Sequence, residues 1–113
     1  MTKKNDFYDK VFEVVAQIPY GKVTTYGAIA NYLGSGGSSR LVGYALNSSI
    51  KQPYVNLPCH RVVNRLGQLT GKVHFGADVM ETLLRHEGIE FTAEDTINIE
   101  KHFWNPIELE NHV

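Results

Sequence analysis

The residues best suited to chemistry lie in one short stretch, Asn56-Leu57-Pro58-Cys59-His60-Arg61-Val62-Val63-Asn64-Arg65. Cys59 is the only cysteine in the 113 residues. Pro58 restricts the backbone before it, while His60 supplies a proton acceptor and Arg61 a fixed positive charge. Such neighbours can lower the pKa of a thiol and raise its nucleophilic thiolate fraction. The stretch therefore indicates a reactive cysteine. The alternative is an inert cysteine in an ordinary strand, because free cysteine is often buried.

Length and composition limit the class of protein. A chain of 113 residues is expected to form a single domain, residues 1–113, around one core, and this small size favours a monomer. The sequence lacks an apolar run long enough to span a membrane and an apolar signal core, so we expect a cytoplasmic protein with no membrane partner. One cysteine cannot close an internal disulfide. The five histidines lack zinc spacing, so we expect no metal site.

Acidic residues are unevenly distributed along the chain. All twelve lie in the two flanks, and the 64 residues from Val14 to Ala77 contain none. That acid-free span carries six cations: Lys22, Arg40, Lys51, Arg61, Arg65 and Lys72. If the span forms one surface, that surface is positive and suits a polyanion such as DNA. The alternative is a neutral-to-basic core region with solvated lysines.

The first half of the chain has the spacing of three helices. Apolar residues recur at helical intervals over residues 7–18, with Asp6 as the cap. Thr25 is placed to cap a short helix over residues 26–33, and a glycine-rich connection leads to a helix that begins near Ser39. The apolar side of this third helix is formed by Leu41, Val42, Ala45 and Leu46. Two helices joined by a glycine-containing turn are the outline of a helix-turn-helix.

The second half is more irregular. We expect an extended segment over residues 57–63, then a turn and an irregular loop up to Phe75. A further helix is expected to open with a capping-box variant, to face the core with two leucines and to close at a glycine; these residues are Asp78, Leu83, Leu84 and Gly88. Short strands and an aromatic anchor follow. The predicted fold is mainly α with a small β component, a winged helix-turn-helix-like single domain.

Four blocks of this sequence resemble the DNA-binding domain of the O6-alkylguanine-DNA alkyltransferases. In order, and at nearly the family spacing, they are Gly21-Lys22-Val23-Thr24-Thr25-Tyr26, Ser39-Arg40-Leu41-Val42-Gly43, Pro58-Cys59-His60-Arg61-Val62-Val63 and His86-Glu87-Gly88. The resemblance covers residues 7–88. Two branches are close to this chain: the alkyltransferases, and the alkyltransferase-like proteins, which keep the fold, replace the cysteine and act by binding.

The resemblance implies that the partner is duplex DNA containing O6-alkylguanine. Because that lesion lies inside the duplex, the nucleotide must be extruded into a protein pocket. In the family this occurs from the minor groove: an arginine, here Arg40, fills the hole, and a tyrosine, here Tyr26, crowds the adjacent phosphate. Small residues at Gly43 and Ala45 would allow close approach. The implied DNA-binding set is Tyr26, Arg40, Gly43, Ala45, Arg61 and Arg65.

The resemblance also implies a reaction. Cys59 is the expected nucleophile, which takes the alkyl group in one in-line displacement. His60 would act as the base through a water, oriented by Glu87, and Tyr26 would donate a proton to the guanine leaving group. The thioether product is stable, so the protein would act once. No cofactor is expected, since the damaged base is itself the alkyl donor.

Three features depart from the alkyltransferase pattern. Ser49 stands where the family has a hinge asparagine, Val73 and His74 replace a Tyr-Ser pair, and the Phe103-Trp104 tail is closer to the alkyltransferase-like branch. Our first hypothesis is single-turnover transfer to Cys59. The second is a non-catalytic lesion sensor that recruits a downstream repair protein. The third is a helix-turn-helix regulator in which Cys59 is structural.

Overall fold

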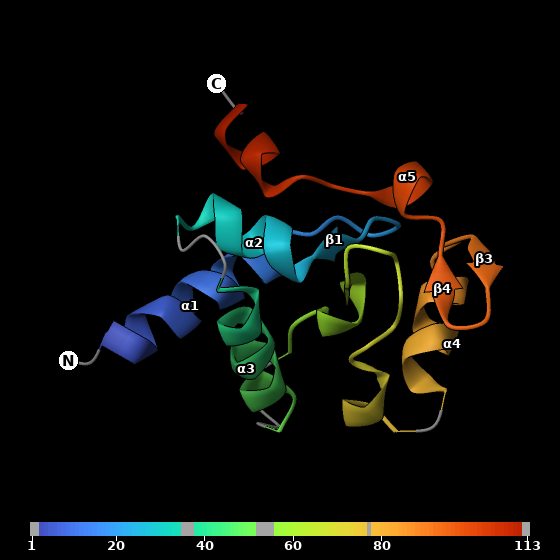
Figure 1. The fold of residues 1–113 in the computed structure, drawn as a ribbon, viewed down its shortest axis with the longest axis horizontal. Helices are drawn as coiled ribbons and strands as arrows, with labels where there is room; N and C mark the ends of the chain where they lie inside the picture. The colour runs from blue at the N-terminus through green and yellow to red at the C-terminus, as the bar shows by residue number, and fades with distance from the viewer. Residues whose placement is uncertain (1–2, 35–37, 52–55, 77, 112–113) are drawn as a thin grey trace.

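The computed structural model describes residues 3–34, 38–51, 56–76 and 78–111. Most of the expected glycine-rich connection, and the loop around position 53, lie outside the described residues. In chain order the elements are α1 (Lys3–Ala16), β1 (Thr24–Thr25), α2 (Tyr26–Tyr32), α3 (Ser39–Ile50), η1 (Cys59–Arg61), β2 (Val62–Val63), η2 (Lys72–His74), α4 (Val79–His86), β3 (Phe91–Ala93), β4 (Thr96–Ile97), α5 (Ile99–His102) and η3 (Pro106–Asn111). The fold is mainly helical with a small β component, as predicted (Figure 1).

The helix α1 closes one side of the larger of two cores. Its apolar stripe, continued by Ile18, packs against α3 and belongs to the same core cluster as residues of α2; the stripe consists of Val11, Val14, Val15 and Ile18. Full burial of each such side chain contributes about 1.5–3 kcal/mol. The predicted Asp6 cap is wrong, because the helix begins at Lys3 and Asp6 lies in its first turn. A carboxylate there still interacts favourably with the helix dipole.

The pair α2–α3 forms the predicted helix-turn-helix. Thr25 caps α2 as expected, since its Oγ1 accepts a hydrogen bond of 3.0 Å from the Ala28 amide. The helix α3 buries the stripe Val42, Ala45, Leu46 and Ser49. Leu41 was expected on this buried side but is 43% exposed. A helix turns by about 100° per residue, which leaves Leu41 at the margin of the stripe.

A two-stranded parallel pair brings the distant chemical residues together. β1 pairs with β2, with Thr24 opposite Val62 and Thr25 opposite Val63. Successive residues of a strand face opposite sides, so Val62 enters the larger core and Val63 the smaller one. With this parallel register the start of α2 lies beside the turn that follows β2, and η1, which carries Cys59, lies beside the residues that precede β1, near the middle of the molecule (Figure 1).

The segment around Cys59 differs from the prediction. Only Val62–Val63 is extended, whereas Cys59–Arg61 forms a 3₁₀ turn closed by a 3.0 Å hydrogen bond from the Arg61 amide to the Pro58 carbonyl. The fixed φ of proline suits the residue that precedes such a turn. The tight turn points the side chains of successive residues in different directions, so that Cys59 and Arg61 have different surroundings.

The helix α4 covers the smaller core with Met80 and Leu84. Two details of its prediction are wrong. Asp78 has a left-handed backbone (φ 57°) and makes no side-chain cap, and Leu83 is 39% exposed. Gly88 ends the helix as predicted, with φ +84°.

The C-terminal tail braces the loop that follows β2. β3 and β4 form an antiparallel hairpin, and the backbone of Gly67 accepts a 2.9 Å hydrogen bond from the Ile97 amide. Contact here is so close that a Cβ on Gly67 would lie 2.5 Å from the Ile97 carbonyl oxygen. Further along, Trp104 donates its amide to the Val23 carbonyl (2.7 Å) and buries its ring in the larger core. The tail therefore holds both β1 and the loop.

Candidate functional site

Cys59 is the first residue of η1, and its side chain lies against α3. Its side chain is buried, with the residue 6% exposed, and its Sγ lies 3.3 Å from the Ser49 Oγ. The Ser49 hydroxyl donates its own hydrogen to the Leu46 carbonyl at 2.8 Å. Since a hydroxyl carries one hydrogen, the thiol is the donor toward Ser49. The sulfur is thus held as a protonated thiol beside the packed side of α3.

Burial raises the pKa of the Cys59 thiol, and the Ser49 hydroxyl, which can turn to donate to the thiolate once the proton has left, offsets only part of that effect. This reverses the expected lowering. The expectation assumed that the Arg61 charge lies near the sulfur, whereas the guanidinium is bonded to Glu87. A buried thiol with a raised pKa needs a base to remove its proton before it can attack.

Glu87, which follows α4, joins three parts of the chain through one carboxylate. His60 Nε2 lies 2.7 Å from its Oε2, and Arg61 donates from Nε and Nη2 at 3.0 and 2.8 Å. The Gly21 amide donates to Oε1 at 2.9 Å. Arg61 also donates from Nη1 to the Ile18 carbonyl at 2.9 Å. The loop after α1, the turn η1 and the end of α4 are therefore connected at Glu87.

The carboxylate of Glu87 is ionised in this setting. Burial by itself raises the pKa of Glu87, but the hydrogen bonds from Arg61, His60 and Gly21 outweigh burial, so the net pKa is lowered. An ionised carboxylate can only accept hydrogen bonds. Nε2 of His60 must therefore be the protonated nitrogen of that ring.

His60 has the protonation state that a base requires. Burial lowers its pKa most strongly, the hydrogen bond and charge of Glu87 raise it, and the Arg61 charge lowers it; the net shift is downward. The neutral ring then carries its proton on Nε2, facing Glu87, and leaves Nδ1 free to accept a proton. The contact between His60 and Glu87 that the resemblance implies is therefore present, and the role of His60 as a base stays a prediction.

Tyr26, the first residue of α2, lies between α3 and the loop that follows β2. Burial raises the pKa of its hydroxyl, with a smaller opposing effect from a hydrogen bond to Thr70 and a further rise from Cys59. A Cβ on Gly71 would lie only 3.1 Å from this hydroxyl, and one on Gly43 would lie 4.0 Å from the ring. Tyr26 therefore keeps its proton at neutral pH and is able to donate it.

The outward side of α3 is hollowed next to Tyr26. A groove of ≈ 350 Å³ is lined by Tyr26, Ser39, Arg40, Gly43, Tyr44 and Asn47. An adjoining hollow of ≈ 340 Å³ includes Asn64, Arg65 and Leu66. Arg40 and Arg65 are exposed, and neither makes an ion pair with a described residue. Two free guanidinium groups beside a groove are suited to contact phosphates.

Two residues expected at a DNA surface lie elsewhere. Ala45 is fully buried in the larger core, because it belongs to the packed stripe of α3. Arg61 has a side chain only 14% exposed, because its guanidinium neutralises Glu87. Gly43, in contrast, lines the groove on the outward side of α3, and its part in DNA approach stays a prediction.

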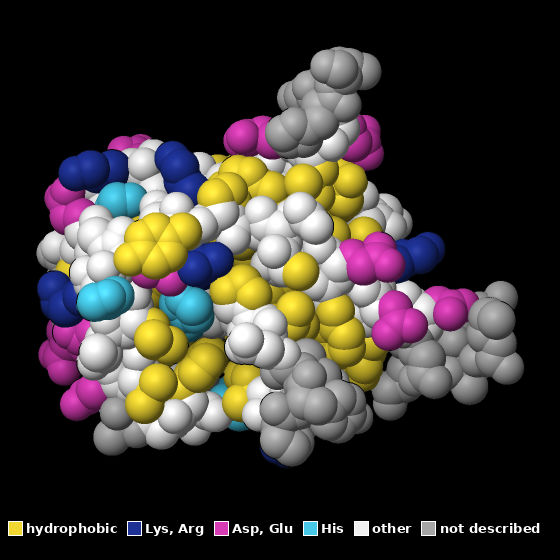
Figure 2. Space-filling model, turned by 180° about the vertical axis from the view of Figure 1, so that it is seen from behind, with side chains coloured by type: hydrophobic (Ala, Val, Ile, Leu, Met, Phe, Trp, Pro, Cys, Tyr) yellow, Lys and Arg dark blue, Asp and Glu magenta, His cyan; other side chains and the backbone are white. Residues whose placement is uncertain are grey.

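The acid-free span contributes only part of a positive surface. Arg61 pairs with Glu87, and Lys72 pairs with Asp95 of the tail, so acids from the C-terminal flank neutralise two of the cations. In the view of Figure 2 apolar side chains spread across the middle and acidic side chains gather toward the margins. That face is not a continuous positive surface.

Sequence reasoning missed three neighbours of the central residues. Ser49 touches the thiol, Thr70 bonds to Tyr26, and Gly71 leaves room for the Tyr26 hydroxyl. Of these three residues, the sequence drew attention only to Ser49, since it stands where the family has a hinge asparagine. Val73 and His74, expected at the pocket wall, are exposed on η2.

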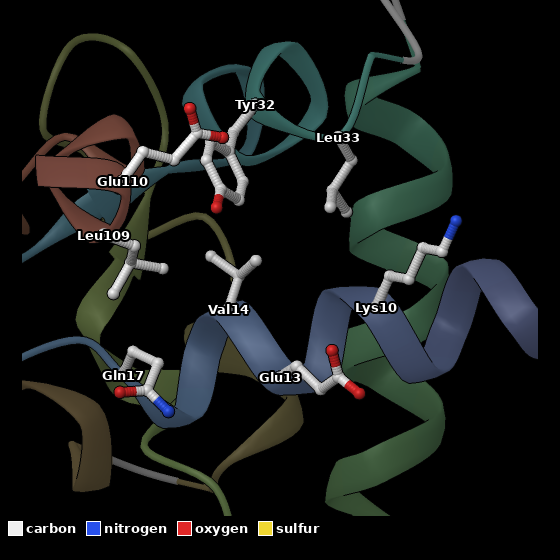
Figure 3. A pocket seen from close by; sticks show the side chains of 8 residues that line it. All are labelled: Lys10, Glu13, Val14, Gln17, Tyr32, Leu33, Leu109 and Glu110. Carbon is white, nitrogen blue, oxygen red and sulfur yellow. The ribbon is translucent and has the colours of Figure 1, made fainter. Parts of the chain in front are cut away.

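A cavity of ≈ 640 Å³ lies away from these residues, between α1, the end of α2 and η3. Figure 3 shows Val14, Tyr32 and Leu109 around it, with Glu13 and Glu110 at its margin. No residue expected to act in catalysis or DNA binding lines this cavity. Within the described residues there is neither a cluster of metal-binding side chains nor a helix that is long and apolar enough to cross a membrane.

Comparison with known families gives a match over most of the chain. A model of the DNA-binding domain of 6-O-methylguanine DNA methyltransferase matches residues 6–89. Alkyltransferase-like protein 1 of Schizosaccharomyces pombe is 35% identical and covers 92% of this chain and 99% of its own length. A methylated-DNA–protein-cysteine methyltransferase of Methanosarcina acetivorans is 42% identical over 74% of this chain, which spans 51% of that relative.

Solved structures agree with these sequence matches. S. pombe Atl1 in complex with damaged DNA containing O6-carboxymethylguanine has a TM-score of 0.74 at 34% identity, covering 91% of this chain and 98% of that one. Mycobacterium tuberculosis OGT in complex with DNA has a TM-score of 0.62 at 38% identity, covering 73% of this chain and 49% of that one.

Proposed function

The chain belongs to the 6-O-methylguanine DNA methyltransferase family, and from this premise we propose that it repairs O6-alkylguanine in duplex DNA by moving the alkyl group to Cys59. The observation that carries the proposal is the 2.7 Å contact between His60 Nε2 and Glu87, one residue along the chain from the thiol. This contact orients a neutral imidazole and leaves Nδ1 free to accept a proton. A purely structural cysteine has no need of such a base.

The proposed reaction is one displacement at the alkyl carbon. The thiol proton of Cys59 passes through a water to Nδ1 of His60, and the sulfur forms a bond to the alkyl carbon. The bond from that carbon to guanine O6 breaks, and its electron pair stays on the base. The hydroxyl of Tyr26, whose raised pKa keeps it protonated, supplies a proton to the guanine. The proton taken up by His60 is released to water and Tyr26 regains one from water, so the products are intact guanine and a thioether on Cys59.

DNA binding is proposed at the outward side of α3. Arg40 occupies the space left by the extruded nucleotide, Tyr26 contacts the adjacent phosphate, and Arg65 contacts the backbone from the turn after β2. Arg61 and Ala45 have no such role, because both side chains are turned inward. The relatives solved as complexes with DNA support this use of the fold.

The proposal is tested by measuring whether the protein converts O6-methylguanine in a DNA duplex back to guanine. A duplex with O6-methylguanine in a restriction site resists cleavage, and stoichiometric protein should restore cleavage once per molecule. Added protein at one-tenth of the DNA concentration should repair about one-tenth of it and then stop. Continued turnover, or no repair at equimolar protein, would contradict transfer to Cys59.

A second candidate is lesion binding without transfer. The raised pKa of Cys59 and the match along nearly the full length of alkyltransferase-like protein 1 favour it. In this case the protein would hold O6-alkylguanine for a downstream repair protein. Lesion-selective binding with no repair of the DNA is the result that distinguishes it.

A further inference from the structure

The outward side of α3 carries a large aromatic side chain that the proposed reaction does not use. Tyr44 is 51% exposed, and its hydroxyl has no hydrogen-bond partner among the described residues. A single exposed aromatic residue is ordinary by itself. What distinguishes Tyr44 is its position relative to Arg40.

Helical geometry places both side chains in the same groove. The outward stripe of α3 consists of Arg40, Gly43, Tyr44 and Asn47, spaced three and four residues apart. The opposite stripe is packed in the core. The residues that line the groove include no acid, so a polyanion meets one cation, two tyrosine rings and two polar side chains there.

We propose that Tyr44 is a second DNA-inserting residue, whose ring wedges against the base pair beside the nucleotide that Arg40 replaces. This inference rests on the proposed function. Four residues of helix span about 6 Å, and base pairs are about 3.4 Å apart. The Tyr44 ring therefore reaches the DNA one to two base pairs away from the position of the extruded nucleotide. Side chains that wedge between base steps from the minor groove unstack them, which makes extrusion of the neighbouring nucleotide easier.

Gly43 makes this approach feasible. It lies between Arg40 and Tyr44 on the outward stripe and presents no side chain to the DNA. The helix backbone can therefore enter a narrow groove while the longer side chains on either side extend further. Leu41 is a matched control, because it is 43% exposed on the same helix but does not line the groove.

The experiment compares Tyr44→Ala, Tyr44→Phe and Leu41→Ala with the wild type. Each binds a duplex that contains O6-methylguanine, with 2-aminopurine on one side or the other, and is measured by anisotropy and by 2-aminopurine fluorescence. Stacking of one aromatic ring corresponds to a loss of about 5- to 140-fold in affinity for Tyr44→Ala. Alanine favours helix, so α3 should persist, which circular dichroism checks. Tyr44→Phe and Leu41→Ala should bind as the wild type does.

The wild type should change the fluorescence of the flanking 2-aminopurine, and Tyr44→Ala should remove that change. Affinity of Tyr44→Ala within twofold of the wild type would overturn the wedge. If Tyr44→Phe is as weak as Tyr44→Ala, the hydroxyl makes the contact, and the wedge is again wrong. Failure of the wild type to prefer the lesion duplex is a different result: it refutes the proposed function, and the wedge with it.

Discussion

At the scale of single residues, Glu87 determines which nitrogen of His60 carries the proton and where the Arg61 guanidinium lies. Its carboxylate is shared by Arg61 and His60, and the imidazole stays neutral because burial lowers its pKa, with a smaller lowering from the Arg61 charge. Arg61 is in this sense a positioning residue. It holds Glu87 in the orientation that directs the His60 proton.

Loss of Arg61 should destabilise the fold strongly. Arg61→Met leaves the buried Glu87 carboxylate with only His60 and the Gly21 amide as partners, and removing one member of a buried ion pair costs about 3–5 kcal/mol. The control, Arg65→Met, changes an exposed side chain and should alter stability by less than about 0.5 kcal/mol. Urea unfolding followed by circular dichroism measures both. Equal stability of the two variants would show that the ion pair is unimportant.

The rate of alkyl transfer should depend on the protonation of His60. Because its pKa is lowered from 6.5, the rate should hold as pH falls to 6.5 and decrease only below it. His60→Gln should be slower by about 10²–10⁴-fold and should lack this decrease. Single-turnover rates across pH provide the measurement. An inflection above pH 6.5 would mean that His60 is stabilised as a cation.

At this scale the sequence allowed part of the site to be predicted. Cys59 and His60 were singled out by residue type and order, and the resemblance added Glu87; the structure places His60 in contact with Glu87, while their catalytic roles stay predictions. The role of Arg61 was not predicted, because the sequence does not distinguish an arginine that binds a phosphate from one that pairs with a buried carboxylate. Its partner follows it by 26 positions along the chain.

At the scale of elements, the contact between the loop after β2 and the C-terminal hairpin sets the position of the residues beside Tyr26. Gly67 begins this contact and has φ +83°. Helices were predicted well, since their periodicity is local. The 3₁₀ turn at Cys59 and the uncapped start of α4 were not, since tertiary contacts decide them.

Gly67→Ala should therefore lower the free energy of unfolding more than Gly34→Ala does. Gly34 also has positive φ (+79°), but among the described residues no atom beyond its chain neighbours lies within 4 Å of its Cβ position. Both variants incur about 1–2 kcal/mol for a left-handed alanine, and Gly67→Ala adds about 1–3 kcal/mol for crowding against Ile97. Chemical denaturation of the two variants gives the comparison. A smaller loss for Gly67→Ala than for Gly34→Ala would contradict the tight contact.

At the scale of the whole molecule, two histidines, the partly buried His60 and the buried His102, join different parts of the chain in their neutral form. His60 bonds to Glu87, and His102 accepts the Glu90 amide on Nε2 at 2.9 Å. Burial is the largest cause of the lowered pKa of each. The tail that carries His102 lies beyond the residues matched by the family model, so the resemblance gave no guide to this contact.

Stability should consequently fall as the solution is acidified below pH 6.5. The unfolded histidines take up protons near their ordinary pKa, whereas the folded ones resist until lower pH, so protons favour the unfolded state in that window. Melting temperatures at pH 7.5 and 5.5 test this. His102→Gln should reduce the difference, and His74→Gln, at an exposed position, should leave it unchanged. A protein equally stable at both pH values would contradict neutral buried histidines.

The most direct measurement of the central claim is the intact mass of the protein after incubation with a duplex that contains O6-methylguanine. Transfer predicts that the wild type gains one methyl group in place of the thiol hydrogen, mapped to the peptide that contains Cys59, while Cys59→Ser gains nothing. An unchanged wild-type mass under conditions where lesion-selective binding is demonstrated would contradict the transfer and leave lesion binding as the function.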